Sequence, residues 1–306
     1  MTALARAAAL VEEYLLVWVL LSVAVGLLVP SVAVLTPLST PILAVMIGSI
    51  SLTLSPTAFR SVRRRALGVI LLVQTGMPVL AYGIARLLAL SPTLTLGFVV
   101  LGAVTPELVA PVMTELGGGD TALSTTVLVL VGLGSLVLVP GAVAVLLGDA
   151  GTTFETGRIV ESLLLAVVGP MSVAVALRSR YPARVGRYDG HYTAVSALMV
   201  IAIIGIVTAA NAAVLRRGGP LVVAVGAGAL LLNLLGYAGG WVATISFGRA
   251  ERIAGLFSVG MRDFAVAAGL LVSAGVPAAA LPAVVFGIVE MATSATLVRW
   301  LQNVSS

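Results

Sequence analysis

The sequence predicts an all-α integral membrane protein with about ten transmembrane helices. Of its 306 residues, 60% are hydrophobic and only 9% are charged, and the mean hydropathy is +1.17. A soluble globular domain has roughly a quarter of its residues charged, so this composition excludes one. The apolar stretches are about 20 residues long and show no alternation of period two, which favours helices over an outer-membrane barrel.

The first half of the chain contains five apolar stretches. The first is expected to be a retained helix rather than a signal peptide, because Glu12 and Glu13 precede it and no clear small-residue cleavage site follows. The fourth contains two helix breakers, Pro106 and Pro111, so we expect it to be interrupted. The predicted helices are Tyr14–Val29, Val32–Leu54, Ala66–Leu90, Leu94–Leu116 and Thr121–Leu147.

A polar connection, GDAGTTFETGR at residues 148–158, separates these from five further stretches. The ninth contains Gly260, and we expect that helix to be interrupted as well. The predicted helices are Ile159–Leu177, Ala194–Val214, Leu221–Ile245, Ile253–Val272 and Leu281–Trp300. We therefore expect residues 1–306 to form one transmembrane domain, with one repeat at about 14–147 and a second at about 159–300.

The arginines predict the orientation of the helices. With the N-terminus in the cytoplasm, twelve arginines fall in cytoplasmic segments and four fall outside, which the positive-inside rule favours. We therefore expect a multi-pass protein of the cell membrane with both termini cytoplasmic. The cytoplasmic set is Arg6, Arg60, Arg63, Arg64, Arg65, Arg178, Arg180, Arg184, Arg187, Arg249, Arg252 and Arg299, and the outer set is Arg86, Arg158, Arg216 and Arg217.

Composition also excludes several function classes. The chain has no Cys and one His, so we expect no disulfide, no zinc site of the usual kind and no other cofactor. The net charge of +5 does not indicate nucleic-acid binding, because the arginines lie in short loops where they set topology. An intramembrane hydrolase needs paired aspartates, a metal cluster or a nucleophile with its base, so we expect no enzyme.

Three charged residues lie inside apolar stretches that also contain helix breakers: Glu107 in the fourth, and Arg262 and Asp263 in the ninth. An ionised side chain at this depth costs about 2.5 to 3.5 kcal/mol, so it is expected to face a cavity or a partner. Interrupted helices with charge at mid-membrane are typical of the substrate and ion site of a secondary transporter. Glu107 and Asp263 are also related by an offset of 156 residues, which suggests an inverted repeat.

Three motifs in this order resemble the bile acid:sodium symporter family, whose broader group includes arsenite-efflux carriers. They are MIGSISLTLSPTAFRSVRRRALGV (46–69), VMTELGGGDTALS (112–124) and VGMRDFAVAAGL (259–270). The resemblance implies two inverted five-helix repeats. It also implies a panel of segments 1, 2, 6 and 7, a core of segments 3–5 and 8–10, and a crossing of the broken segments 4 and 9. Sodium-coupled members bind sodium near that crossing.

The match differs from the family pattern at several positions. The Ser-Asn pair of the family falls on Ala110 and Pro111, and Ser124 keeps its hydroxyl. In the ninth segment, Ser258 replaces an acidic residue, and Arg262 with Asp263 stands in place of Gln-Asn. We therefore leave the coupling ion open between sodium and a proton. The remaining family-like positions are Gln74 in the third segment and Glu290 in the tenth, the latter similar to a Val-Glu of arsenite carriers.

These observations predict a site with two parts. A guanidinium offers a fork of donors to a carboxylate, so Arg262 is the expected anion-binding residue, with Glu290, Thr105 and Pro111 around the substrate. The expected ion-coupling residues are Glu107, Asp263, Ser124, Ser258 and Gln74. The alternatives are that Arg262 pairs internally with Glu107 or Glu290, that Glu107 lies near the headgroups, and that hydroxyls such as Thr114 and Thr126 bond only their own helices.

The function that follows is secondary active transport of an organic anion by alternating access. Its expected partners are a small anionic substrate and the lipid bilayer, with no protein partner inferred. One alternative is an efflux carrier for an oxyanion such as arsenite. An alternative from another class is a membrane sensor that binds its ligand without transporting it.

Overall fold

The computed structural model describes residues 14–54, 62–152 and 156–303, and within these ranges the chain is helical with no strand. Eight helical segments are long and apolar enough to cross a membrane: 30–51, 64–87, 121–148, 157–180, 182–210, 220–243, 249–273 and 277–303. Val17–Leu28 and Pro92–Ala103 are shorter apolar helices. The prediction of an all-α membrane protein is therefore confirmed. Pro56, Phe59 and Arg60 of the first motif and Glu12 and Glu13 lie outside the described residues.

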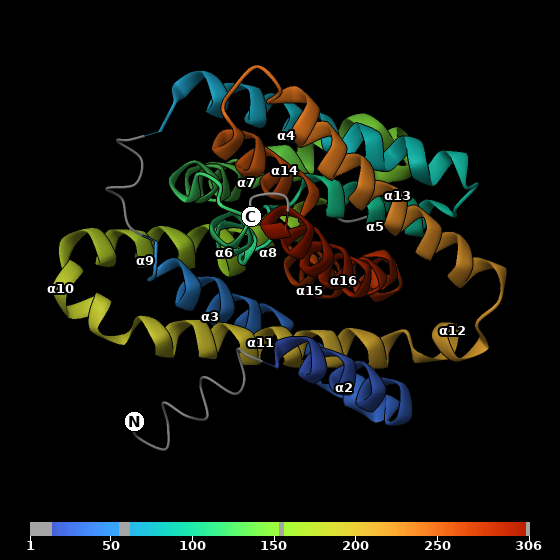
Figure 1. Ribbon diagram of the computed structural model, residues 1–306. Helices are drawn as coiled ribbons and strands as arrows, with labels where there is room; N and C mark the ends of the chain where they lie inside the picture. Colours follow the sequence, from blue (N-terminus) through green and yellow to red (C-terminus); the bar gives the residue numbers. More distant parts are fainter. Residues whose placement is uncertain (1–13, 55–61, 153–155, 304–306) are drawn as a thin grey trace.

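One group of helices forms the lower part of the molecule in Figure 1. Helix α11 runs along its whole length, and α2 packs against α11 at two close approaches: Gly26 meets the backbone of Gly205, and Ser22 Oγ donates to the carbonyl of Ile201 at 2.5 Å. The members are α2 (Leu15–Leu28), the 3-10 helix η1 (Pro30–Leu38), α3 (Ser39–Ser51), the π-helix η3 (Leu164–Val168), α9 (Gly169–Arg180), α11 (Asp189–Ala210) and α12 (Ala212–Arg217). The short helix α8 (Thr156–Leu163), which leads into η3, lies at the centre of Figure 1 against α7 and α15.

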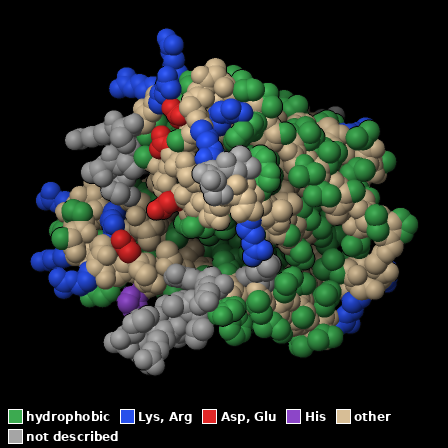
Figure 2. Space-filling view, in the orientation of Figure 1, with side chains coloured by type: hydrophobic (Ala, Val, Ile, Leu, Met, Phe, Trp, Pro, Cys, Tyr) green, Lys and Arg blue, Asp and Glu red, His purple; other side chains and the backbone are tan. Residues whose placement is uncertain are grey.

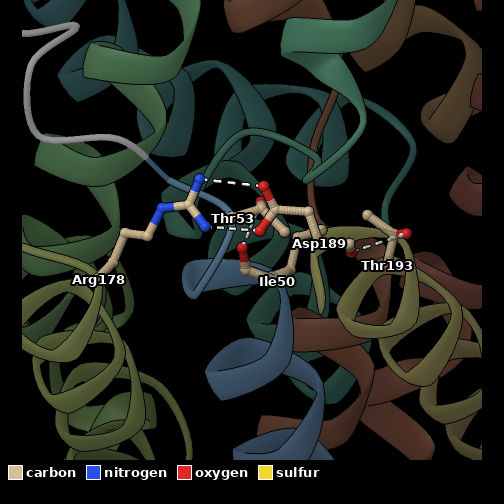
Figure 3. Close-up of polar contacts among 5 residues, drawn as sticks. All are labelled: Ile50, Thr53, Arg178, Asp189 and Thr193. Atoms are coloured by element: carbon tan, nitrogen blue, oxygen red, sulfur yellow. Dashed lines mark hydrogen bonds and ion pairs between the residues drawn. The ribbon is translucent and has the colours of Figure 1, made fainter. Parts of the chain in front are cut away.

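An ion pair connects α9 to α11 across the turn formed by α10 (Pro182–Val185) and η4 (Gly186–Tyr188). Both terminal nitrogens of Arg178 contact the carboxylate of Asp189, at 2.6 and 3.0 Å, as Figure 3 shows. Helix α11 therefore begins at Asp189 rather than at the predicted Ala194, because a carboxylate in the first turn is favourable and is held by Arg178. His191 consequently lies in α11, where it is exposed.

The second group of helices lies above the first in Figure 1 and contains both interrupted helices. Its members are α4 (Arg64–Leu87), α5 (Pro92–Ala103), α6 (Ala110–Leu116), α7 (Thr121–Thr152), α13 (Pro220–Ala243), α14 (Arg249–Gly260), α15 (Phe264–Ser273), η5 (Pro277–Ala280) and α16 (Leu281–Asn303). The segment Arg249–Ser273 is enclosed by its neighbours along its whole apolar length. By contrast, Figure 2 shows many hydrophobic side chains exposed on the face in view.

Glycines allow α13 and α14 to approach closely. A Cβ added to Gly240 would lie 2.1 Å from the carbonyl oxygen of Gly255, and one added to Gly236 would lie 2.9 Å from the Cα of Gly260. Close packing of small residues is a usual way for helices to associate in membranes. This contact packs α13 against the break between α14 and α15.

Candidate functional site

Both expected helix interruptions are present. Helix α5 ends at Ala103 and α6 begins at Ala110, while α14 ends at Gly260 and α15 begins at Phe264. In the first break, Pro106 has no N–H to donate, and proline disfavours the helical conformation of the residue before it, Thr105. Proline chemistry therefore accounts for the first interruption.

The two breaks hydrogen-bond to each other. The N–H of Asp263 donates to the carbonyl of Thr105 at 3.0 Å, and the N–H of Glu107 donates to the carbonyl of Met261 at 3.4 Å. Each broken segment thus satisfies backbone groups that the other leaves without an intrahelical partner, as a buried backbone requires. The result is a junction of four half-helices inside the molecule.

Arg262 lies at this junction and is completely buried, with 0% of its surface exposed. Its Nη1 donates to the carbonyl of Val104 at 3.2 Å, at the C-terminal end of α5, where a cation is favoured. Its Nε and Nη2 are buried without a hydrogen-bond partner. Two of the three guanidinium nitrogens are therefore available to a ligand.

The alternative that Arg262 forms an ion pair with Glu107 or Glu290 is not what the structure shows. Among the described residues, no carboxylate oxygen lies within 4.0 Å of the guanidinium. Glu290 instead accepts a hydrogen bond from the backbone N–H of Arg262, at 3.0 Å from its Oε2. The carboxylate of α16 contacts the main chain because the guanidinium extends away from it, toward α5.

Asp263 and Glu107 each present an acceptor without a partner. Asp263 Oδ1 caps α15 by accepting from the N–H of Val266 at 2.8 Å, and its Oδ2 is buried and unpaired. Glu107 Oε2 is also buried and unpaired, and this residue is 6% exposed, so it does not lie at the surface of the molecule. The junction therefore has unsatisfied acceptors as well as donors.

Gln74, Ser124 and Ser258 form a chain of hydrogen bonds beside the junction. Gln74 Nε2, on α4, donates to the carbonyl of Ser258 at 2.6 Å. Ser258 Oγ, on α14, donates to Ser124 Oγ, on α7, at 3.0 Å. Gln74 Oε1 has no partner. Three helices that are distant in the sequence thus contribute neutral oxygens to one buried region.

Thr105 lies at the junction itself, whereas Pro111 lies in the first turn of α6. The carbonyl of Thr105 is part of the junction, and its hydroxyl donates to the carbonyl of Pro106 at 2.8 Å. Pro111 is buried at the second position of α6, and its ring has no polar atom to offer a ligand. The hydroxyls of Thr114 and Thr126 bond carbonyls of their own helices, which confirms that interpretation for both.

Sequence reasoning missed the contribution of α13. Asn233 Nδ2 donates to the carbonyl of Gly260 at 3.1 Å, and its Oδ1 accepts from Thr293 of α16 at 2.7 Å. The hydroxyl of Tyr237 is buried without a partner, and its ring lies against Gly260. The signal was present, since Asn233 is a lone amide within the apolar run LLLNLL.

The junction holds more acidic groups than basic ones. Glu107, Asp263 and Glu290 are three carboxyl groups beside one guanidinium, and all four side chains are buried. In the described ranges, no three His, Cys, Asp or Glu side chains converge closely enough to hold a metal ion. The arrangement thus places a guanidinium with two unpaired nitrogens beside two carboxyl groups that each have an unpaired oxygen.

Comparison with known proteins gives the family. The sequence profile of the Sodium Bile acid symporter family matches residues 40–218, which is more than half of the chain. The chain is also 26% identical over 278 residues to the uncharacterized sodium-dependent transporter YocS of Bacillus subtilis (strain 168), covering 89% of this chain and 85% of that protein. Members of this family are transporters and not enzymes. The protein thus belongs to the Sodium Bile acid symporter family.

Proposed function

We propose that this protein is a secondary active transporter of an organic anion that works by alternating access. The observation that supports this most is the buried guanidinium of Arg262, whose Nε and Nη2 have no partner at the junction of two interrupted helices. A buried cation without an ion pair is costly, and an anionic ligand removes that cost. In this proposal Arg262 binds the carboxylate of the substrate through its fork of donors.

The other predicted residues take supporting roles around the substrate. Glu290 accepts a hydrogen bond from the backbone of Arg262, and the carbonyl of Thr105 accepts one from the backbone of Asp263 in the facing break. Pro111 shapes the start of α6. Substrate selectivity would then depend on the space next to Arg262, while these residues keep the guanidinium in position.

Coupling uses positive charge supplied from solution. Once the substrate carboxylate has paired with Arg262, three protein carboxyl groups remain without a charged partner, and a cation or a proton must neutralise part of that charge. Glu107 Oε2 and Asp263 Oδ2 offer unpaired oxygens for it, and Ser124, Ser258 and Gln74 offer neutral ones. The printed name of the Bacillus relative supports sodium over a proton as the first ion to test.

Alternating access is proposed to move the two groups of helices against each other. Glu107 and Asp263 occupy matching places in the two breaks, as expected for two inverted repeats at about 14–147 and 159–300. The group of α2, α3, α9 and α11 forms the panel of the proposal, and the group with the broken helices forms the core. Arg side chains gather at the end where α4 and α14 begin, which supports a cytoplasmic location for that end and for both termini in the cell membrane (Figure 2).

Flux measurements in proteoliposomes test the proposal. Wild-type protein and the Arg262→Gln variant are reconstituted side by side, and uptake of labelled bile acids, keto acids and pantoate-like acids is followed with a sodium gradient, a pH gradient or neither. We expect one carboxylate to be taken up only with a gradient, and Arg262→Gln to abolish that uptake. Transport of arsenite alone would support the efflux alternative, and ligand-induced stabilisation without any flux would support a sensor.

A further inference from the structure

A pocket with a volume of about 580 Å³ lies outside the crossing, at the N-terminal end of α4. Its walls are Arg63, Arg65, Gly68, Val69 and Leu72 on one side and Phe247, from the turn before α14, on the other. None of these residues takes part in the proposed transport site.

The residues of α4 in this pocket share one face of the helix. Arg65, Gly68, Val69 and Leu72 follow the spacing i, i+3, i+4 and i+7, which places them in a row. The row begins with a charged side chain at the end of the helix and continues with apolar surface along the membrane-spanning part, where Leu72 is 73% exposed. A polar mouth followed by an apolar groove matches a molecule with a charged head and a hydrocarbon tail.

The mouth of the pocket has excess positive charge. Arg63 is held over it by Glu251, whose Oε1 lies 3.1 Å from Nη1, and by the ring of Phe247, 5.4 Å from the guanidinium carbon. The side chain of Arg63 is nevertheless 58% exposed. Arg65 makes no hydrogen bond or ion pair within the described part of the chain, so its guanidinium is available. Figure 2 shows arginine side chains gathered at the upper left, the side on which α4 begins in Figure 1.

The floor of the groove is open at Gly68. A Cβ added there would meet no heavy atom within 4 Å, so a larger side chain would occupy the groove without striking the protein. Gly76, on the same helix but outside the pocket, is equally unobstructed. This pair of glycines provides a site-directed block and a matched control.

We propose that this pocket binds a membrane phospholipid with an anionic headgroup. The phosphate contacts Arg63 and Arg65, and one acyl chain lies along Gly68, Val69 and Leu72. Arginine recognises phosphate by paired hydrogen bonds, and basic residues beside a membrane-spanning helix attract anionic lipid. A lipid is favoured over free phosphate because a free phosphate would use only the mouth and leave the apolar row empty.

Lipid titration of the purified full-length protein in detergent tests the proposal. The ligands are dioctanoylphosphatidylglycerol, dioctanoylphosphatidylcholine and glycerol 3-phosphate, the readout is the shift in Tm, and native mass spectrometry counts bound lipid. We expect phosphatidylglycerol to bind about tenfold more tightly than phosphatidylcholine, and glycerol 3-phosphate to have no effect. Equal responses to the two lipids, or an equal response to glycerol 3-phosphate, would overturn the assignment.

Variants locate the binding. Arg65→Gln should weaken phosphatidylglycerol binding about fivefold, since each basic residue near the surface contributes about 1 kcal/mol. Gly68→Leu should remove the response, whereas Gly76→Leu and Arg184→Gln, an exposed arginine at another turn, should keep it. Glu251→Gln should bind at least as tightly as wild type, because it frees Arg63. Loss of binding in Glu251→Gln, or retention in Gly68→Leu, would contradict the proposal.

Discussion

The backbone N–H of Arg262 donates to Glu290 Oε2 at 3.0 Å, so the carboxylate of α16 holds the main chain of the broken helix and leaves the guanidinium to other partners. Because the contact is made by an N–H and not by the charged side chain, it persists whatever the guanidinium binds. Glu290 is therefore expected to act on the geometry of the break.

A first prediction follows for Glu290. Glu290→Ala leaves a buried N–H without a partner and should lower the free energy of unfolding by about 1 to 3 kcal/mol. Glu290→Gln keeps an acceptor oxygen and should lose less than Glu290→Ala. The Tm of both variants in detergent gives the comparison. Equal losses would show that the charge of Glu290, rather than its hydrogen bond, stabilises the break.

The second prediction concerns the hydrogen bond between Ser258 and Ser124. Each single change to Ala should cost about 1 kcal/mol or more, because it leaves the other buried hydroxyl unpaired. The double variant should cost less than the two singles together, since neither hydroxyl then remains. Unfolding of the four proteins, with and without sodium, checks this. Additive losses would mean that the two hydroxyls do not interact.

The third prediction uses Gly260, at the end of α14. A Cβ at this position would lie 2.0 Å from Cδ1 of Tyr237, so Gly260→Ala must displace the ring or the helix. We expect a loss of about 1 to 3 kcal/mol or failure to fold. Tyr237→Leu in the same chain should restore part of the loss. As the control, Gly83→Ala meets no atom within 4 Å and should fold normally, and a wild-type Tm for Gly260→Ala would contradict the packing.

The fourth prediction concerns the ion pair of Arg178 and Asp189. Because the side chain of Asp189 is 42% exposed, Asp189→Asn should lower the free energy of unfolding by only about 0.5 to 1 kcal/mol at low ionic strength. The difference from wild type should shrink in 1 M salt, which screens charges beyond about 3 Å. Thermal unfolding at two salt concentrations measures it. A difference that does not change with salt would assign the effect to hydrogen bonding alone.

Much of the site could be predicted because charge and helix breakers are rare in an apolar chain. Pro106 and Gly260 indicated the two interruptions, and Glu107, Arg262 and Asp263 indicated where buried charge must be accommodated. The structure brings these residues together at one junction. Asn233 was missed although its signal was of the same kind, because a neutral amide is less conspicuous than a charge.

The partners of each group could not be predicted from the sequence. Ser124, Ser258 and Gln74 were selected by resemblance, and only their positions on three packed helices join them by hydrogen bonds. Whether Arg262 pairs with a carboxylate was left open, because a sequence does not show which way a side chain leaves a non-helical backbone. At the break, the side chain of Arg262 donates to Val104 and its backbone N–H donates to Glu290.

The sequence by itself determined that the chain is helical, that it lies in a membrane and that two of its helices are interrupted, because hydropathy and proline and glycine chemistry act locally. The tertiary structure alone decided that the two breaks bond to each other and that two guanidinium nitrogens and two carboxylate oxygens stay unpaired. Those outcomes depend on distances between segments more than 100 residues apart, such as the 158 residues between Val104 and Arg262, which local preferences do not specify.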